Sequence, residues 1–104
     1  MKTPYEMFGV ECEDGWRGII EPLMQECQEK GVVITQIKEK YGTLRFYVAE
    51  CDAAMWNKIQ KAEEASASIC EKCGQPGRLR GKGWLKTLCG EHAKELNYEY
   101  EPTE

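Results

Sequence analysis

Apolar and polar positions along this chain follow helical and extended patterns in turn. Apolar residues recur at helical spacing over residues 16–27, with Asp14 placed to cap the start and Gly31 to end the helix. Pro22 lacks an amide hydrogen and disfavours helical backbone in the residue before it. Because proline suits the first position of a helix, we expect the regular helix to begin near Glu21.

Two extended runs follow, over residues 32–37 and 43–48, joined by a short link that contains Gly42. β-branched residues dominate the first run, and the second alternates strictly between apolar and polar side chains. This pattern predicts a β-hairpin. The buried face of its second strand would carry Leu44, Phe46 and Val48. The other face would carry Thr43, Arg45 and Tyr47.

A second helix is predicted to begin after Asp52, which can cap it, and to run toward Ser68. Its expected apolar stripe comprises Met55, Trp56, Ile59, Ala62 and Ile69. Farther along, residues 78–80 and 84–86 flank a glycine-containing turn and predict a second hairpin, ahead of a helix-like segment over residues 91–96.

These elements predict a small single α+β domain. Residues 1–69 would form a helix–hairpin–helix part, and residues 70–97 a structural metal module packed on it. Residues 98–104 would form an acidic, flexible tail. A length of 104 residues, with 41% hydrophobic and 31% charged residues, fits one globular domain.

Composition narrows the setting. No apolar run approaches the length of a membrane span, and the start of the chain lacks the apolar segment of a signal peptide, so we expect a cytoplasmic protein. The formal net charge of −4 disfavours a protein coated by nucleic acid over its whole surface. Basic side chains concentrate in two segments, residues 32–49 and 70–90.

The six cysteines fall into two groups. A disulfide framework would need an oxidising compartment, which the expected location does not supply. Cys12, Cys27 and Cys51 are scattered, and we interpret them as buried or idle thiols. Cys70 and Cys73 form a Cys-x-x-Cys pair, and Cys89 lies three residues before the single histidine.

The four residues of the expected metal site are Cys70, Cys73, Cys89 and His92. Three thiolates and an imidazole suit tetrahedral Zn²⁺, and Gly74 permits the tight turn that a metal-binding knuckle needs. Cys89 would begin a helix, where free amides favour a thiolate. The order of knuckle, hairpin and helix predicts a treble-clef-like zinc module. The alternatives are unrelated buried cysteines, a redox pair and an iron–sulfur cluster.

Four protein ligands leave no position for substrate, so the zinc would be structural. The single histidine is already assigned to it, and no nucleophile motif, phosphate-binding loop or dinucleotide fingerprint occurs. We therefore expect no enzymatic activity.

Two surfaces are candidates for binding. The first is the polar face of the first hairpin, with Lys38, Lys40, Arg45 and Tyr47. The second is a basic strip of the metal module, with Arg78, Arg80, Lys82, Trp84 and Lys86, which could hold phosphates and stack on a base. The alternative for the hairpin face is the ordinary polar side of a half-covered sheet. The alternative for the basic strip is that Trp84 packs the metal module while the charged side chains are simply solvated.

The run QIKEKYGTLRFY over residues 36–47, followed by Cys70–His92 with its GRLR and GWLKTLC segments, resembles small proteins of bacteriophages and prophage regions. The resemblance transfers no function. It implies a bacterial host cytoplasm and an accessory protein that binds a host protein or defence complex, as anti-CRISPR inhibitors do.

From the sequence we therefore expect a non-catalytic zinc-binding protein of this kind, which binds a bacterial protein or complex. The alternative is a zinc-ribbon-like nucleic-acid binder that uses the basic strip.

Overall fold

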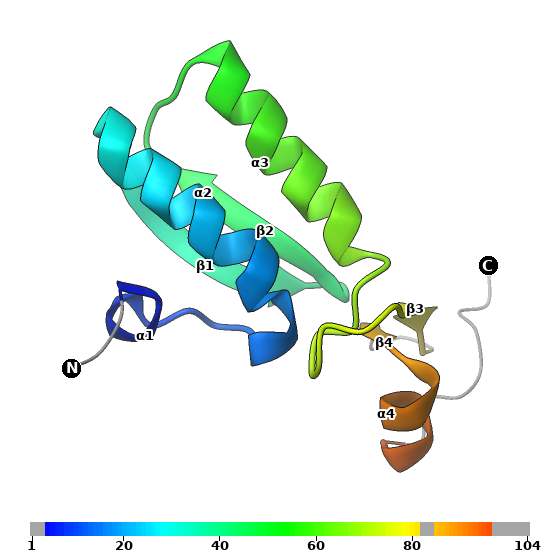
Figure 1. Cartoon of the computed structure of the whole chain (residues 1–104). Coiled ribbons are helices and arrows are strands. Elements are labelled where there is room, and N and C mark those ends of the chain that lie inside the picture. Colours follow the sequence, from blue (N-terminus) through cyan, green and yellow to red (C-terminus); the bar gives the residue numbers. More distant parts are fainter. Residues whose placement is uncertain (1–3, 82–84, 97–104) are drawn as a thin grey trace.

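The computed structural model describes residues 4–81 and 85–96. Its elements, in chain order, are α1 (Pro4–Phe8), a 3₁₀ turn (Asp14–Trp16), α2 (Arg17–Lys30), β1 (Ile34–Lys40), β2 (Thr43–Val48), α3 (Ala53–Ser66), β3 (Arg78–Arg80), β4 (Lys86–Leu88) and α4 (Gly90–Glu95). Helices α2 and α3 lie side by side on one face of the β1–β2 hairpin, and β3, β4 and α4 gather beyond its turn (Figure 1). The predicted α+β architecture with two antiparallel hairpins is confirmed. None of the described helices is long and apolar enough to span a membrane.

The main core lies between the two long helices and the inner face of the hairpin. Its fully buried members include Trp16, Ile20, Ile37, Leu44, Met55 and Ile59. A second, smaller cluster surrounds the cysteines near the C-terminus and contains Cys70, Leu88, Cys89 and Ala93. The β1–β2 hairpin turns through Tyr41 and Gly42, both with positive φ, of 54° and 83°. Such a two-residue turn matches the twist of the strands.

The prediction that the first long helix begins near Glu21 is wrong, because α2 begins at Arg17 and contains Pro22. Pro22 cannot bond the Gly18 carbonyl, but both residues are exposed, so water can satisfy that group. Packing of Trp16 and Ile20 in the core outweighs the preference of the proline. Asp14 lies in the 3₁₀ turn and does not cap α2.

Gly31 does end α2, in the left-handed conformation, as predicted. Asp52 caps α3 as predicted, because its carboxylate accepts a bond from the Met55 amide. The place of Trp56 in the apolar stripe is wrong. Its side chain is 54% exposed, because Met55 and Ile59 already occupy the inward positions of α3.

Further differences concern element boundaries and one missed element: β1 spans Ile34–Lys40 where residues 32–37 were predicted, and α4 spans Gly90–Glu95 where residues 91–96 were predicted. Helix α3 ends at Ser66, and Ile69 packs against the core from outside the helix. The second strand of the later hairpin, β4, spans Lys86–Leu88, so it excludes Leu85 of the predicted run; Trp84, where that run begins, lies outside the described residues. Helix α1 was not predicted, because five residues are too few for a helical periodicity to be recognised.

Candidate metal centre

The four predicted ligands come together from two places in the chain. Cys70 and Cys73 lie in the turn after α3, whereas Cys89 and His92 lie at the start of α4. Their ligand atoms all lie within 4.8 Å of one another. They are the one such group of cysteine, histidine and acidic residues that residues 4–81 and 85–96 contain.

The separations between the ligand atoms fit a tetrahedral metal. Cys73 Sγ and Cys89 Sγ are 3.7 Å apart, and Nδ1 of His92 lies 3.6 Å from Cys70 Sγ and 3.3 Å from Cys89 Sγ. Metal–sulfur bonds of about 2.3 Å and metal–nitrogen bonds of about 2.0 Å give tetrahedron edges of about 3.5–3.8 Å. The sulfur separation is far longer than a disulfide bond. The residues therefore fit a metal ion.

The turn around Cys70 is built by the backbone. The Cys70 amide donates to the Gln75 carbonyl at 2.8 Å, and the Gly74 amide donates to the Cys70 carbonyl at 2.9 Å. Gly74 has a φ of 82°, which favours glycine. Burial raises the pKa of the Cys70 thiol, but backbone N–H groups of Cys89, Cys73 and Lys72 outweigh this effect, and the pKa falls to about 7. The backbone of the knuckle thus favours the thiolate form of Cys70, the form that binds metals.

Helix α4 supplies the other two ligands. Cys89 is its N-cap residue, and its Sγ accepts a hydrogen bond from the His92 amide at 3.5 Å. Nδ1 of His92 faces the thiols, and Nε2 lies 3.9 Å from the Glu95 carboxylate. A carboxylate near the second ring nitrogen is a common partner of a metal-binding histidine.

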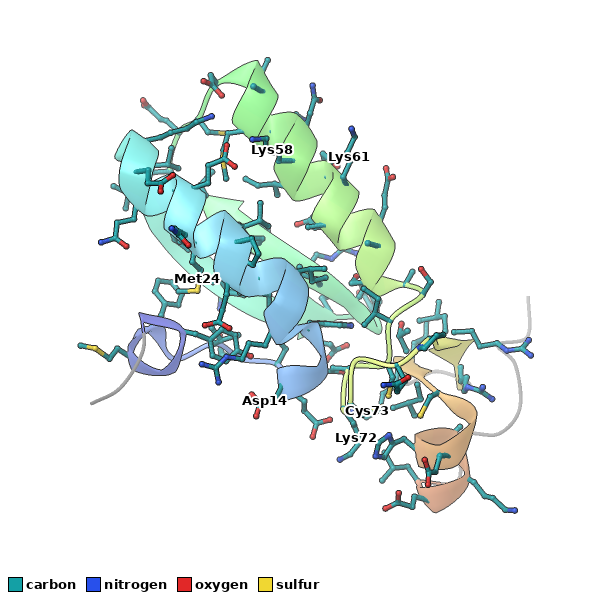
Figure 2. All side chains as sticks on the ribbon, viewed as in Figure 1. Asp14, Met24, Lys58, Lys61, Lys72 and Cys73 are labelled. Atoms are coloured by element: carbon teal, nitrogen blue, oxygen red, sulfur yellow. The ribbon has the colours of Figure 1, made fainter. Side chains whose placement is uncertain are left out.

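The knuckle packs directly against the segment that precedes α2. The Gly15 amide donates to the Glu71 carbonyl at 2.6 Å, and Trp16 Nε1 donates to the Ile69 carbonyl at 2.8 Å. A Cβ on Gly15 would collide with the backbone of Cys70 and Glu71. Figure 2 shows Asp14 on the segment that precedes α2, and Lys72 and Cys73 on the knuckle. The contact explains why a glycine is needed at this place.

Glu71 is the buried centre of this junction, with 3% of its surface exposed. Its carboxylate accepts a bond from the Glu13 amide at 3.2 Å, and burial raises its pKa. Gly15 and Glu71 were not among the predicted site residues. Their only local signal is a glycine before a buried tryptophan, and nothing in the sequence ties that pair to the knuckle.

The four candidate residues of the first hairpin share one face, as predicted. Lys38 pairs with Arg45 across the strands, Gln36 with Tyr47, and Lys40 with Thr43. Their side chains lie opposite the buried ones of Ile37, Leu44 and Phe46. We call this set the outer face: Gln36, Lys38, Lys40, Thr43, Arg45 and Tyr47.

The basic strip is only partly described. Arg78 and Arg80 lie on β3, and Arg80 pairs with Lys86 of β4. Nε of Arg80 donates to the Leu88 carbonyl at 3.1 Å, so this arginine takes part in holding the module together. Lys82 and Trp84, the other two members, lie outside the described residues.

The remaining cysteines lie apart from the metal site. Cys27 is buried, Cys12 and Cys51 are half-buried, and all three are free thiols that belong to or pack against the main core. Burial raises the pKa of Cys12 to about 12, with further contributions from the carboxylates of Glu71 and Glu39. A thiol with so high a pKa stays protonated and unreactive near neutral pH.

Comparison of the chain with protein-family models, curated proteins and solved structures gives no match. Function must therefore be argued from the site and surfaces of this molecule.

Proposed function

We propose that the chain is a zinc-stabilised, non-catalytic domain that binds a protein partner through the outer face. The metal assignment is supported by the donor set, since three thiolates and one imidazole at tetrahedral separations suit Zn²⁺ better than harder divalent cations. The order of knuckle, β3–β4 hairpin and α4 supports a treble-clef-like module.

The proposed role of zinc is structural. All four coordination positions are taken by protein ligands, and the only histidine of the chain is one of them. Zinc bound in this way contributes about 10–16 kcal/mol of apparent folding free energy near neutral pH. In a chain of 104 residues, whose core alone gives modest stability, a bound zinc ion would supply a large share of the folding free energy.

One observation carries the proposed binding surface. The outer face presents Lys38, Lys40 and Arg45, and among the described residues none of the three makes an ion pair. The chain has 18 acidic residues against 14 basic ones, so three cations without ion pairs on one face concentrate positive charge in a chain that is acidic overall. Tyr47, 41% exposed, adds an aromatic side chain of the kind enriched in protein interfaces.

The alternative function is nucleic-acid binding by the basic strip. One of its two described arginines, Arg80, is engaged with the Leu88 carbonyl, and the negative net charge opposes binding to phosphates. We therefore place the protein partner first. The bacteriophage setting, the bacterial cytoplasm and an anti-defence role stay predictions from the sequence resemblance.

Two measurements test the proposal. Metal analysis should find one zinc per chain, lost in Cys73→Ser and retained in Cys51→Ser, which changes a half-buried thiol outside the site. Affinity capture from bacterial lysate should retain a stoichiometric protein after nuclease treatment. That capture should fail for Arg45→Ala with Tyr47→Ala and persist for Lys61→Ala on α3. The proposal would be contradicted if nuclease treatment abolished capture, or if the double variant captured the partner as well as the unaltered chain.

A further inference from the structure

The outer face extends beyond the hairpin, across the segment that precedes α2. Glu11 forms a parallel bridge with Lys38, in which its amide donates to the Ile37 carbonyl at 2.9 Å. Bridge partners point to the same side of a sheet, so Glu11, Lys38 and Arg45 form a row across the outer face. Gln36 Nε2 donates to the Glu11 carboxylate at 2.9 Å and holds it at the rim.

Some cations elsewhere in the molecule have carboxylate partners. Lys58 and Lys30 both bond Glu26, and Lys72 bonds Glu13 at 3.1 Å. Within the part of the chain that the structure describes, Lys38 and Arg45 have no such partner although Glu11 is close by. One oxygen of the Glu11 carboxylate accepts the bond from the Gln36 amide. In the described part of the molecule, no ion pair joins Glu11 to Lys38 or Arg45, so both cations remain available to an external anion.

Arg45 is suited to hold that anion. It is half-buried between its neighbours on β2, and its Nε is enclosed without a hydrogen-bond partner in the described structure. The outer amino groups of a guanidinium match a carboxylate, with which they can form two parallel hydrogen bonds. Tyr47 lies near one end of the face and Tyr41, 65% exposed, lies at the turn.

In the middle of each strand, the outer edge of the hairpin already has hydrogen-bond partners and cannot accept an added strand. On the β2 side, the amides of Leu44 and Phe46 donate to Ser66 Oγ at 2.9 Å and to the Glu63 carboxylate at 2.8 Å. On the β1 side, the Glu39 amide donates to the Glu11 carbonyl at 3.3 Å. A partner must therefore be recognised by side chains of the outer face, and not by added backbone pairing.

The same contacts place a carboxylate at each edge, Glu11 on the β1 side and Glu63 on the β2 side. A basic centre between acidic edges complements a surface with the opposite pattern. A nucleic-acid strand offers phosphates throughout and would be repelled at both edges. A protein segment can offer carboxylates at its centre and cations on either side.

We propose that the outer face binds a carboxylate-bearing segment of the partner protein, with Arg45 and Lys38 holding the carboxylates and Glu11 facing a basic side chain. This inference rests on the proposed function and specifies the chemistry of its partner. It assigns Arg45 as the central contact and Glu11 as the residue that selects protein over nucleic acid.

The test titrates two probes into the metal-loaded full chain and monitors binding by the chemical shifts of its backbone amides. One probe is a twelve-residue peptide with a central Glu-Glu pair and a lysine near each end, and the other is a twelve-nucleotide oligothymidine. The peptide should shift amides of β1 and β2, and Arg45→Gln should weaken it about tenfold. Lys61→Gln, which removes an exposed lysine on the outer side of α3, should leave binding unchanged (Figure 2).

Glu11→Lys separates the two ligand classes. This variant should weaken peptide binding several-fold and strengthen oligothymidine binding, because it removes the acidic edge. Absence of outer-face shifts at millimolar peptide, or preference of the unaltered chain for oligothymidine, would overturn the inference. If lysate capture depends on Arg45 and Tyr47 but ignores Lys38→Gln and Glu11→Lys, the carboxylate assignment is wrong and the proposed function stands. If capture ignores all four residues, the proposed function itself is wrong.

Discussion

The Thr87 hydroxyl donates a 2.7 Å hydrogen bond to the Gly42 carbonyl, joining the turn of the first hairpin to the strand that leads into Cys89. Thr87 is fully buried, and its own carbonyl accepts a bond from the Glu71 amide at 2.9 Å. One residue therefore links the hairpin turn, β4 and the knuckle, through its hydroxyl on one side and its backbone carbonyl on the other. The metal module and the hairpin are held in a fixed relation by this residue.

Thr87→Val should lower the free energy of unfolding by about 1–2 kcal/mol, because it keeps the shape of the side chain and removes a buried hydrogen bond. Zinc binding should be unchanged, since all four ligands remain. Urea unfolding of the metal-loaded chain measures the first effect and metal titration the second. Thr87→Ser, which restores the hydroxyl, should recover part of the loss, and equal losses in both variants would contradict this account.

Gly42→Ala should be more costly than a positive φ alone explains. A Cβ at this position would lie 2.5 Å from Leu79 Cδ1 and 3.1 Å from the Leu85 carbonyl carbon. We expect a loss of about 2–4 kcal/mol from backbone strain and crowding together. Gly31→Ala is the matched control, because its φ of 70° is similar and nothing lies within 4 Å of the added Cβ. It should cost about 1 kcal/mol, and similar losses at the two sites would show that crowding is unimportant.

Removal of the metal should unfold at least the module. The apparent contribution of a structural zinc, about 10 kcal/mol or more, is comparable to the whole stability of a small domain. Excess chelator should therefore remove the protection of the Gly15 and Glu71 amides from hydrogen exchange, since these bonds depend on the knuckle. Added zinc should restore it. Unchanged protection after chelation would show that the module folds without metal.

Ser66→Ala should weaken the closed edge of β2. The Ser66 hydroxyl accepts the Leu44 amide and donates to the Glu63 carbonyl, and the residue is fully buried. The substitution leaves a buried amide without a partner, which costs about 1–3 kcal/mol. The control is Ser68→Ala, an exposed serine whose hydroxyl bonds the Ala65 carbonyl, with an expected loss of about 0.5 kcal/mol or less. Thermal unfolding of both variants decides the matter.

Glu26 should make stability depend on pH. Hydrogen bonds from Lys58 and then Lys30 lower the pKa of this carboxyl below its ordinary value of 4.5. A lowered native pKa stabilises the fold above about pH 4.5, and the benefit is lost as pH falls through the native value. Glu26→Gln should therefore be less stable than the unaltered chain at pH 7, and the difference should shrink toward pH 3. Urea midpoints at the two pH values test this, and a constant difference would contradict it.

Local patterns were enough to predict much of this molecule. The alternation over β2 indicated its buried face, and Asp52 and Gly31 indicated helix boundaries, because these signals act between residues close in the sequence. The Cys-x-x-Cys pair and the Cys89–His92 pair indicated the four residues of the candidate metal site for the same reason, since ligand spacing is set by local turns.

Tertiary structure decided what local signals could not contain. Pro22 lies within α2 because core packing outweighs its preference, and Trp56 faces solvent because Met55 and Ile59 take the inward positions. The contacts of Gly15 with the knuckle and of Gly42 with Thr87 join segments far apart in the chain, as does the placement of Glu11 beside Lys38. Spacing and periodicity describe neighbours along the backbone, whereas these contacts depend on how complete elements pack, and only the folded chain brings them together.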